Sequence, residues 1–194
     1  SFTVTSIGFA DNIIYRNNAK INDDIYVSGN LGDSYLGLLV LKNKIKLNPR
    51  LTKYFTNEYF MPNIQSKLID QIAKFANTSI DISDGLLADL DKMINNQKLS
   101  YKLFLKDIPI SNNLKKILDL KILPKINCIS NGDDYQVLFT ASKNKTRIIK
   151  KIASNFRVKL TKIGSIQSHA EKSSIIDGKN RKITLKNKGY FHKF

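Results

Sequence analysis

Hydrophobic and polar positions along this chain alternate between two spacings, one typical of strands and one typical of helices. Period-two patterns predict strands at residues 2–9, 25–28, 78–83, 99–105, 135–140 and 157–166. Stripes of apolar residues at spacings of three and four predict helices at about 33–42, 49–62, 64–75, 84–96, 114–120 and 143–155. Residues 173–185 are typical of a hairpin that turns at Asp177-Gly178. This mixed order predicts an α/β (α+β sandwich) fold, with helices packed on a mixed β-sheet.

The composition is that of an ordinary folded domain. Of the 194 residues, 42% are hydrophobic, which is enough for a buried core. The single Cys128 excludes an intrachain disulfide and a multi-cysteine metal site, in keeping with a reducing compartment. No apolar run approaches the roughly 20 residues that span a bilayer, and no secretory signal is visible. We therefore expect a cytoplasmic protein without a membrane partner.

The formal net charge of +16 raises the question of nucleic-acid binding. The basic residues are mostly lysines, only five are arginines, and they are spread along predicted helices and loops. Non-specific attraction to polyanions follows from the charge, but specific binding would need an arginine-rich patch or a known module. Because neither is present, we expect no specific nucleic-acid partner. A non-catalytic basic binding module remains an alternative.

The most informative segment is Asp81-Ile82-Ser83-Asp84-Gly85-Leu86, at the junction of a predicted strand and a predicted helix. A helix N-terminus has unpaired N–H groups and a positive dipole end, which suits phosphate. Asp81 and Ser83 share one face of an extended strand, and Asp84 can turn toward it. Such oxygen ligands suit a hard divalent cation that carries phosphate. The alternative is that Ser83 and Asp84 cap the helix, which would leave Asp81 unexplained.

Other candidate motifs are weaker. Residues 29–34, Gly-Asn-Leu-Gly-Asp-Ser, form a strand–loop–helix junction without the P-loop ending, and predict either phosphate contact or a turn in which Asp33 caps the helix. Residues 131–135, Asn-Gly-Asp-Asp-Tyr, form a turn into a strand whose paired acids could simply be solvated. His169 and His192 are isolated, which argues against a catalytic triad.

In order and spacing, these segments resemble the C-terminal half of the thiamine-monophosphate kinase family, from about Arg16 to the end of the chain. The segments that carry the resemblance are residues 16–20, 24–29, 32–34, 81–86, 89–90, 131–135, 139–140, 163–164 and 189–192. Siblings in the same superfamily, with selenophosphate, aminoimidazole ribonucleotide or hydrogenase-maturation chemistry, are the enzyme alternative. The terminal Gly-Tyr-x-His favours the thiamine branch, and there is no C-terminal cysteine of the hydrogenase-maturation type.

The resemblance implies ATP-dependent phosphorylation of thiamine monophosphate to thiamine diphosphate, on the fold of the aminoimidazole ribonucleotide synthetase superfamily. It implies that Mg²⁺ is required as a cofactor and that ATP is the co-substrate. The implied site residues are Asp81 and Asp84 for Mg²⁺, Arg16 and Ser83 for ATP, and Asp133 and Tyr190 for thiamine monophosphate. No general base is needed, because the accepting phosphate is already anionic near neutral pH. Phosphoryl transfer mainly needs charge neutralisation and alignment.

The chain departs from the family pattern in several places. Asn131, Asp133 and Gln136 stand where the family has Gly, Glu and Glu, and residues 62–65 lack the expected Pro-x-Pro-Arg. The family's N-terminal domain, with further acidic ligands and the dimer interface, is also missing. We expect residues 1–15 to be the last strand and linker of that domain, and residues 16–194 to be the C-terminal kinase domain. This predicts that the chain alone is inactive and that the full enzyme is a homodimer.

Overall fold

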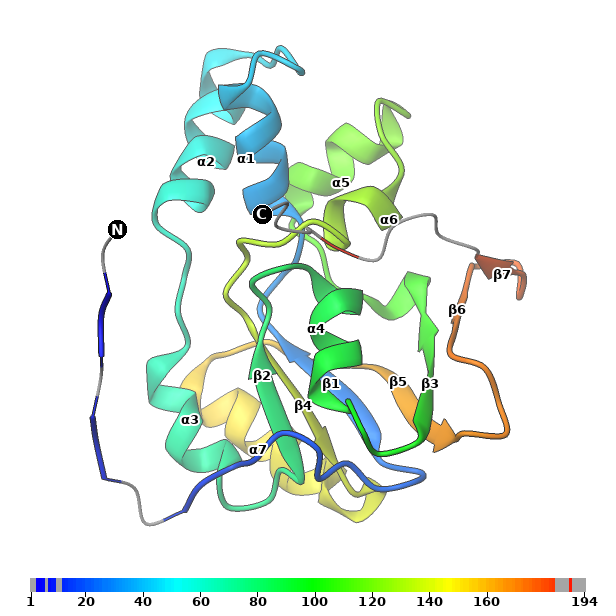
Figure 1. The fold of residues 1–194 in the computed structure, drawn as a ribbon. Coiled ribbons are helices and arrows are strands. Elements are labelled where there is room, and N and C mark those ends of the chain that lie inside the picture. Colours follow the sequence, from blue (N-terminus) through cyan, green and yellow to red (C-terminus); the bar gives the residue numbers. More distant parts are fainter. Residues whose placement is uncertain (1–2, 6, 10–11, 184–188, 190–194) are drawn as a thin grey trace.

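A seven-stranded sheet lies at the centre of the fold, with helices on both faces and a group of helices at one end (Figure 1). The computed structural model describes residues 3–5, 7–9, 12–183 and 189. Its strands are β1 Asp24–Ser28, β2 Thr78–Asp81, β3 Leu99–Phe104, β4 Val137–Ala141, β5 Leu160–Ser168, β6 Ser174–Ile176 and β7 Lys182–Ile183. Its α-helices are α1 Asp33–Leu41, α2 Pro49–Phe60, α3 Ser66–Ile72, α4 Leu86–Met93, α5 Asn112–Asp119, α6 Lys125–Ile129 and α7 Thr146–Phe156. Two 3-10 turns are η1 Leu105–Asp107 and η2 Lys143–Lys145.

The strand order β2-β4-β1-β5-β3-β6-β7 places two distant parts of the sequence side by side. All neighbouring strands are antiparallel except β3 and β6, which are parallel. Among the described strands, β2 pairs only with β4, and Asp81 lies opposite Val137 at the end of this ladder. The register therefore brings the chain that leaves β2 next to the chain that enters β4.

The two faces of the sheet carry different cores because successive strand residues point to opposite sides. Ile25 and Val27 of β1 lie in the core under α4, whereas Tyr26 between them faces α3 and α7. The Tyr26 ring stacks on Phe139 of β4, with ring centroids 5.3 Å apart. α4 covers one face, and its Leu90 is fully buried there.

The helices α1, α2, α5 and α6 form a third cluster beyond one end of the sheet (Figure 1). Leu36 of α1, Phe55 of α2 and Leu114 of α5 are fully buried in it. α1 and α2 approach closely at Gly37, where an added Cβ would lie 2.1 Å from the carbonyl oxygen of Phe55. None of the helices in the described part of the chain has the length and apolar character needed to cross a lipid bilayer.

Most predicted elements are confirmed, with boundaries that shift by a few residues. The closing hairpin is confirmed in its described part, where β6 pairs with β7 and the N–H of Asp177 donates to the carbonyl oxygen of Arg181 at 2.9 Å. The short helix α6 was not predicted. The described residues of the segment 2–9 form no strand in this structure, and Val4, Ile7 and Phe9 are exposed, so their assignment as the last strand of a neighbouring domain stays a prediction.

Candidate functional site

Two loops that are far apart in sequence are joined by backbone hydrogen bonds beyond the end of the β2–β4 ladder. The N–H of Ile82 donates to the carbonyl oxygen of Gln136, and the N–H of Tyr135 donates to that of Ile82, both at 2.9 Å. The N–H of Asp133 donates to the carbonyl oxygen of Ser83, also at 2.9 Å. The two motifs singled out in the sequence therefore form one surface.

Glycines permit this close approach of the two loops. An added Cβ on Gly132 would lie 1.6 Å from the carbonyl oxygen of Ser83. Gly85 has φ 118°, and its Cβ would lie 2.3 Å from the carbonyl oxygen of Ser130. Side chains at these two positions would push the loops apart, because each would overlap backbone atoms that cannot move independently.

Helix α4 is capped from within, by Asp89 in its first turn. The Asp89 carboxylate is 1% exposed, and its Oδ2 accepts from the N–H groups of Ser83, Asp84 and Gly85 at 2.9, 2.8 and 3.1 Å. The N-cap residue is Gly85, and no side chain caps the helix from that position. The prediction that Ser83 and Asp84 cap the helix is therefore wrong.

The same contacts correct the expectation that the N–H groups of this junction are free for phosphate. Asp89 already accepts from three of them and offsets the positive end of the helix dipole. The sequence did carry a signal for this role. Asp89 is an acid on the apolar face of the predicted helix, between Leu86 and Met93, and a buried acid needs hydrogen-bond donors.

Because Asp89 supplies the cap, the side chains of the loop remain available to a ligand. Within the described residues, the Asp81 carboxylate and the Ser83 hydroxyl have no hydrogen-bond partner. The Asp84 carboxylate is paired with the ammonium group of Lys92, which also donates to Asp89 Oδ1 at 2.9 Å. Burial lowers the pKa of Lys92, but its bonds to Asp84 and Asp89 outweigh this and raise it. Lys92 thus remains a cation beside Asp84.

The charges of three carboxylates from the two loops affect the pKa of one phenol, that of Tyr135. Burial raises the pKa of Tyr135, and the charges of Asp133, Asp81 and Asp84 raise it further. Burial also raises the pKa of Asp133, as does the charge of Asp84. These effects place all three carboxylates within electrostatic range of Tyr135, so the acids form a locally negative corner on a strongly basic chain.

The corner opens into a cavity of about 780 Å³ between the two loops and the α1–α2 helices. Ser83, Asp84 and Asp133 line one side of the cavity. Tyr35, Tyr59 and two lysines line the other side, and the sequence motifs did not point to these residues. The cavity is large enough for a small organic ligand.

The carboxylate oxygens at the corner suit a Mg²⁺ ion whose other ligands are water and substrate phosphates. No cluster of three or more acidic, histidine or cysteine side chains arranged to hold a metal ion occurs in the described ranges of the chain. Mg²⁺ is commonly bound by one or two carboxylates together with water and substrate phosphates. The exposed Asp81 and the partly exposed Asp84 fit that mode, because both present oxygen ligands with room for further ligands.

The structure separates Arg16 from Ser83. The N–H of Asn17 donates to the carbonyl oxygen of Met93 at 2.9 Å, so the chain beside Arg16 lies at the C-terminal end of α4. Ser83 lies before the N-terminal end of α4. The predicted site residue Tyr190 falls outside the described residues. Its described neighbour Gly189 lies against Asp84 and Ala88, where an added Cβ would be 2.8 Å from the Asp84 carbonyl oxygen.

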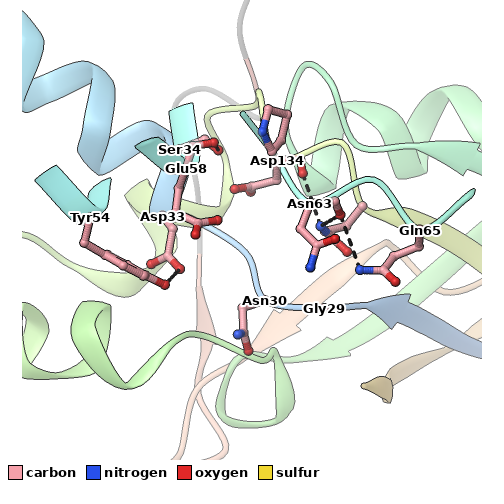
Figure 2. Close-up of a pocket in the computed structure, with 11 residues that line it drawn as sticks. Gly29, Asn30, Asp33, Ser34, Tyr54, Glu58, Asn63, Gln65 and Asp134 are labelled. Atoms are coloured by element: carbon pink, nitrogen blue, oxygen red, sulfur yellow. Dashed lines mark hydrogen bonds between the residues drawn. The ribbon is translucent and has the colours of Figure 1, made fainter. Parts of the chain in front are cut away.

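A second, smaller pocket of about 170 Å³ lies beside residues 29–34 (Figure 2). Asp33, Glu58 and Asp134 line it, and none of its described lining residues is basic. Asp134 is buried, and its carboxylate accepts from the N–H of Gly32 at 2.9 Å. Because this N–H is occupied and the lining is acidic, the structure does not favour the phosphate contact predicted for these residues.

Asp33 connects three helices instead of capping α1. Its Oδ1 accepts from the hydroxyl of Ser111 at 2.7 Å. Its Oδ2 accepts from the hydroxyl of Tyr54 at 2.9 Å (Figure 2). The N-cap of α1 is Gly32, with φ 92° and no side-chain cap. Burial raises the pKa of Asp33 to about 6, against the two hydroxyl bonds, which lower it.

Comparison with known proteins gives a consistent result. No protein-family model matches the chain. A thiamine-monophosphate kinase from Buchnera aphidicola subsp. Acyrthosiphon pisum is 36% identical over 181 residues, which cover 92% of this chain and 55% of that protein. The chain is homologous to part of the thiamine-monophosphate kinases. A kinase of the same name from Aquifex aeolicus is 29% identical over 192 residues, covering 98% of this chain and 58% of the relative.

Solved structures support the same relationship and confirm the predicted fold class. Thiamine-monophosphate kinase from Stenotrophomonas maltophilia superimposes with a TM-score of 0.73 at 25% identity, covering 87% of this chain and 54% of that one. A structure described as AaThiL complexed with AMPPCP and TMP gives 0.74 at 26% identity, covering 93% and 55%. HypE of E. coli superimposes with a TM-score of 0.65 at 15% identity, covering 90% of this chain and 52% of that one, which shows a shared fold. The chain thus spans about half the length of its thiamine-monophosphate kinase relatives.

Replacing Asp89 with asparagine tests the cap of α4. We expect Asp89→Asn to lower the free energy of unfolding by about 1–3 kcal/mol, because charge-assisted hydrogen bonds to a buried carboxylate are lost. Hydrogen exchange should quicken at the amides of Ser83, Asp84 and Gly85. The exposed Asp70→Asn in α3 is the control. Unchanged exchange at these three amides in the Asp89 variant would contradict the assignment.

Asp33 should make the stability of the protein depend on pH. Its pKa is raised from 3.8 to about 6 in the fold, so between these values the folded state binds a proton that the unfolded chain does not. Stability should therefore fall as pH rises from about 4 to 6, by up to about 3 kcal/mol, and Asp33→Asn should remove this part of the dependence. Urea unfolding at pH 4, 5, 6 and 7 measures it. An equal pH dependence in the variant would contradict the prediction.

Proposed function

We propose that this chain is the part of a thiamine-monophosphate kinase that binds the acceptor substrate and contributes to the Mg²⁺–ATP site. The observation that carries the proposal is the homology over 92% of the chain. It is combined with the acidic side chains of the two loops, which neither cap the helix nor pack in the core, because Asp89 supplies the cap. The reaction would transfer the terminal phosphoryl group of ATP to thiamine monophosphate, giving thiamine diphosphate. A relative observed with AMPPCP and TMP supports both substrates.

In this proposal, Asp81 and Asp84 hold Mg²⁺ at the mouth of the cavity. The ion would supply neutralisation of the phosphate charge, which phosphoryl transfer requires. Asp84 would exchange its ion pair with Lys92 for the metal, because that pair engages its carboxylate in the absence of a ligand. Lys92 would stay near the transferred phosphate as a second positive charge. Asp133, on the neighbouring loop, would contact the thiamine monophosphate.

Arg16 and Ser83 would contact different parts of the nucleotide. The eight residues of α4 separate the two positions by about 12 Å at 1.5 Å per residue, which an extended nucleotide can span. Ser83 would contact the phosphates beside Asp84, and Arg16 would contact the far end. Tyr190 remains a predicted substrate contact. We infer a cytoplasmic location from the single cysteine, and a homodimer for the full-length enzyme.

Variants of the two aspartates test the Mg²⁺ site directly on this chain. We expect Mg²⁺ and ATP together to raise the melting temperature of the wild-type chain. Asp81→Asn and Asp84→Asn should each weaken the apparent Mg²⁺ affinity by about tenfold, because each loses one anionic ligand. Asp119→Asn, at the end of α5, is the control. Equal Mg²⁺ dependence in wild type and both variants would remove these residues from the site.

We expect activity to require the part of the relatives that this chain does not cover. We expect the purified 194-residue chain to form no thiamine diphosphate from thiamine monophosphate, ATP and Mg²⁺. Activity should appear when the remaining N-terminal part of the Buchnera relative is added. Chromatographic detection of thiamine diphosphate measures both. Robust product formation by the chain alone would refute its dependence on that part. A chain that stays inactive in complementation but binds thiamine monophosphate would retain only the substrate-binding part of the proposal.

A further inference from the structure

The cavity beside the acidic corner has a second wall that the proposed site residues do not explain. This α1–α2 wall consists of Tyr35, Leu38, Leu39, Lys42, Lys44 and Tyr59. It faces Ser83, Asp84 and Asp133 across the same cavity. One small-molecule site therefore has an acidic side and a basic, aromatic side.

The ammonium groups of the two lysines of this wall have no partner among the described residues. In the described part of the protein, neither the Lys42 nor the Lys44 ammonium group forms a salt bridge or a hydrogen bond. Both side chains are exposed. By contrast, Lys92, which pairs with Asp84 of the acidic side, is held by two carboxylates. The free positive charge at the cavity therefore lies on the α1–α2 wall.

A rigid turn holds these lysines in place. The N–H of Lys44 donates to the carbonyl oxygen of Leu39 at 2.8 Å, and the N–H of Asn43 donates to that of Val40 at 3.0 Å. Asn43 between the lysines has φ 54°, the left-handed conformation of a Schellman motif at a helix C-terminus. Because the backbone is fixed on both sides of Asn43, Lys42 and Lys44 reach the cavity from defined positions.

The chemistry of the wall selects a class of ligand. Lysine ammonium groups bind phosphate as point charges, and tyrosine rings accept flat or cationic rings on their faces. A ligand with an aromatic cation and a phosphate would match tyrosines, lysines and the acidic corner together. A neutral apolar ligand would leave the lysines and the aspartates desolvated without partners, which costs free energy.

We propose that Lys42 and Lys44 bind the phosphate ester of the acceptor substrate, and that Tyr35 and Tyr59 receive its rings. The lysines then determine specificity by distinguishing the phosphorylated acceptor from the free alcohol. The acceptor phosphate lies between the lysines and Asp84, facing the group to be transferred. This inference rests on the proposed function, and it assigns substrate selection to residues that bind neither Mg²⁺ nor ATP.

Calorimetric titration of the 194-residue chain with thiamine monophosphate and with thiamine tests the inference. We expect the wild type to bind thiamine monophosphate at least about tenfold more tightly than thiamine, because only the first offers a dianion to the lysines. The double variant Lys42→Ala/Lys44→Ala should lose about tenfold in affinity for thiamine monophosphate, with thiamine affinity changed less than about twofold. The arginine double variant should restore the preference.

Lys46→Ala is the matched control, because Lys46 lies in the same loop and does not line the cavity. An equal loss in Lys46→Ala would mean that only the net charge matters, and would overturn the inference. Equal losses for thiamine and its phosphate, or no change in the double variant, would also overturn it. So would a wild-type chain that binds neither compound. A weaker response to Mg²⁺ and ATP in the lysine variant would instead assign the lysines to the nucleotide.

The inference and the proposed function can fail separately. Complementation with the N-terminal part of the Buchnera relative measures turnover of the lysine double variant. If that variant phosphorylates thiamine monophosphate with wild-type KM, the lysines do not recognise the acceptor and the kinase assignment stands. If the wild type itself shows no turnover while the lysines still discriminate the phosphate in titrations, the kinase assignment fails and the binding site stands.

Discussion

The site depends on one buried carboxylate, that of Asp89, which accepts hydrogen bonds from three successive backbone N–H groups before α4. This contact satisfies the N-terminus of the helix from inside and fixes the loop that carries Ser83 and Asp84. If a side chain of the loop itself capped the helix, that side chain would be unavailable to a ligand. The position of the cap therefore decides whether the loop can bind anything.

A second constraint is the continuation of β-type pairing beyond the sheet. The backbone bonds from Ile82 and Ser83 to the loop before β4 hold two acidic loops against each other. Placing like charges together is unfavourable. The pKa of Asp133 is raised first by burial and then by the charge of Asp84, and the second effect is one expression of that cost. A site with this unfavourable arrangement gains stability when a cation binds, which is the physical basis of the Mg²⁺ proposal.

The net charge of the chain can be interpreted only from where the charged side chains lie in the fold. The net charge of +16 is spread over the surface, while the acids of the two loops meet at a single corner. Across the cavity, Lys42 and Lys44 are positioned by a fixed turn rather than by ion pairs. Opposite charges on facing walls favour a ligand with both a phosphate and a cationic ring over either alone.

The sequence by itself determined the fold class, most helices and strands, and the acids of the proposed site. Local hydrophobic spacing and the Asp81–Asp84 and Asn131–Tyr135 motifs are properties of short segments, so they can be recognised without long-range contacts. The unpaired strand expected at residues 2–9 shows the limit, because alternation predicts a strand only if a neighbour is available to pair with it.

Only the tertiary structure decided which of these residues act together. Three features depend on packing. They are the cap by Asp89, the hydrogen bonds of Asp33 with Ser111 and Tyr54, and the cavity wall with Lys42 and Lys44. Elements distant in the sequence meet at these places, and no local pattern records which donor meets which acceptor. Local spacing therefore fixes the elements, whereas the sheet register and the helix packing fix the chemistry between them.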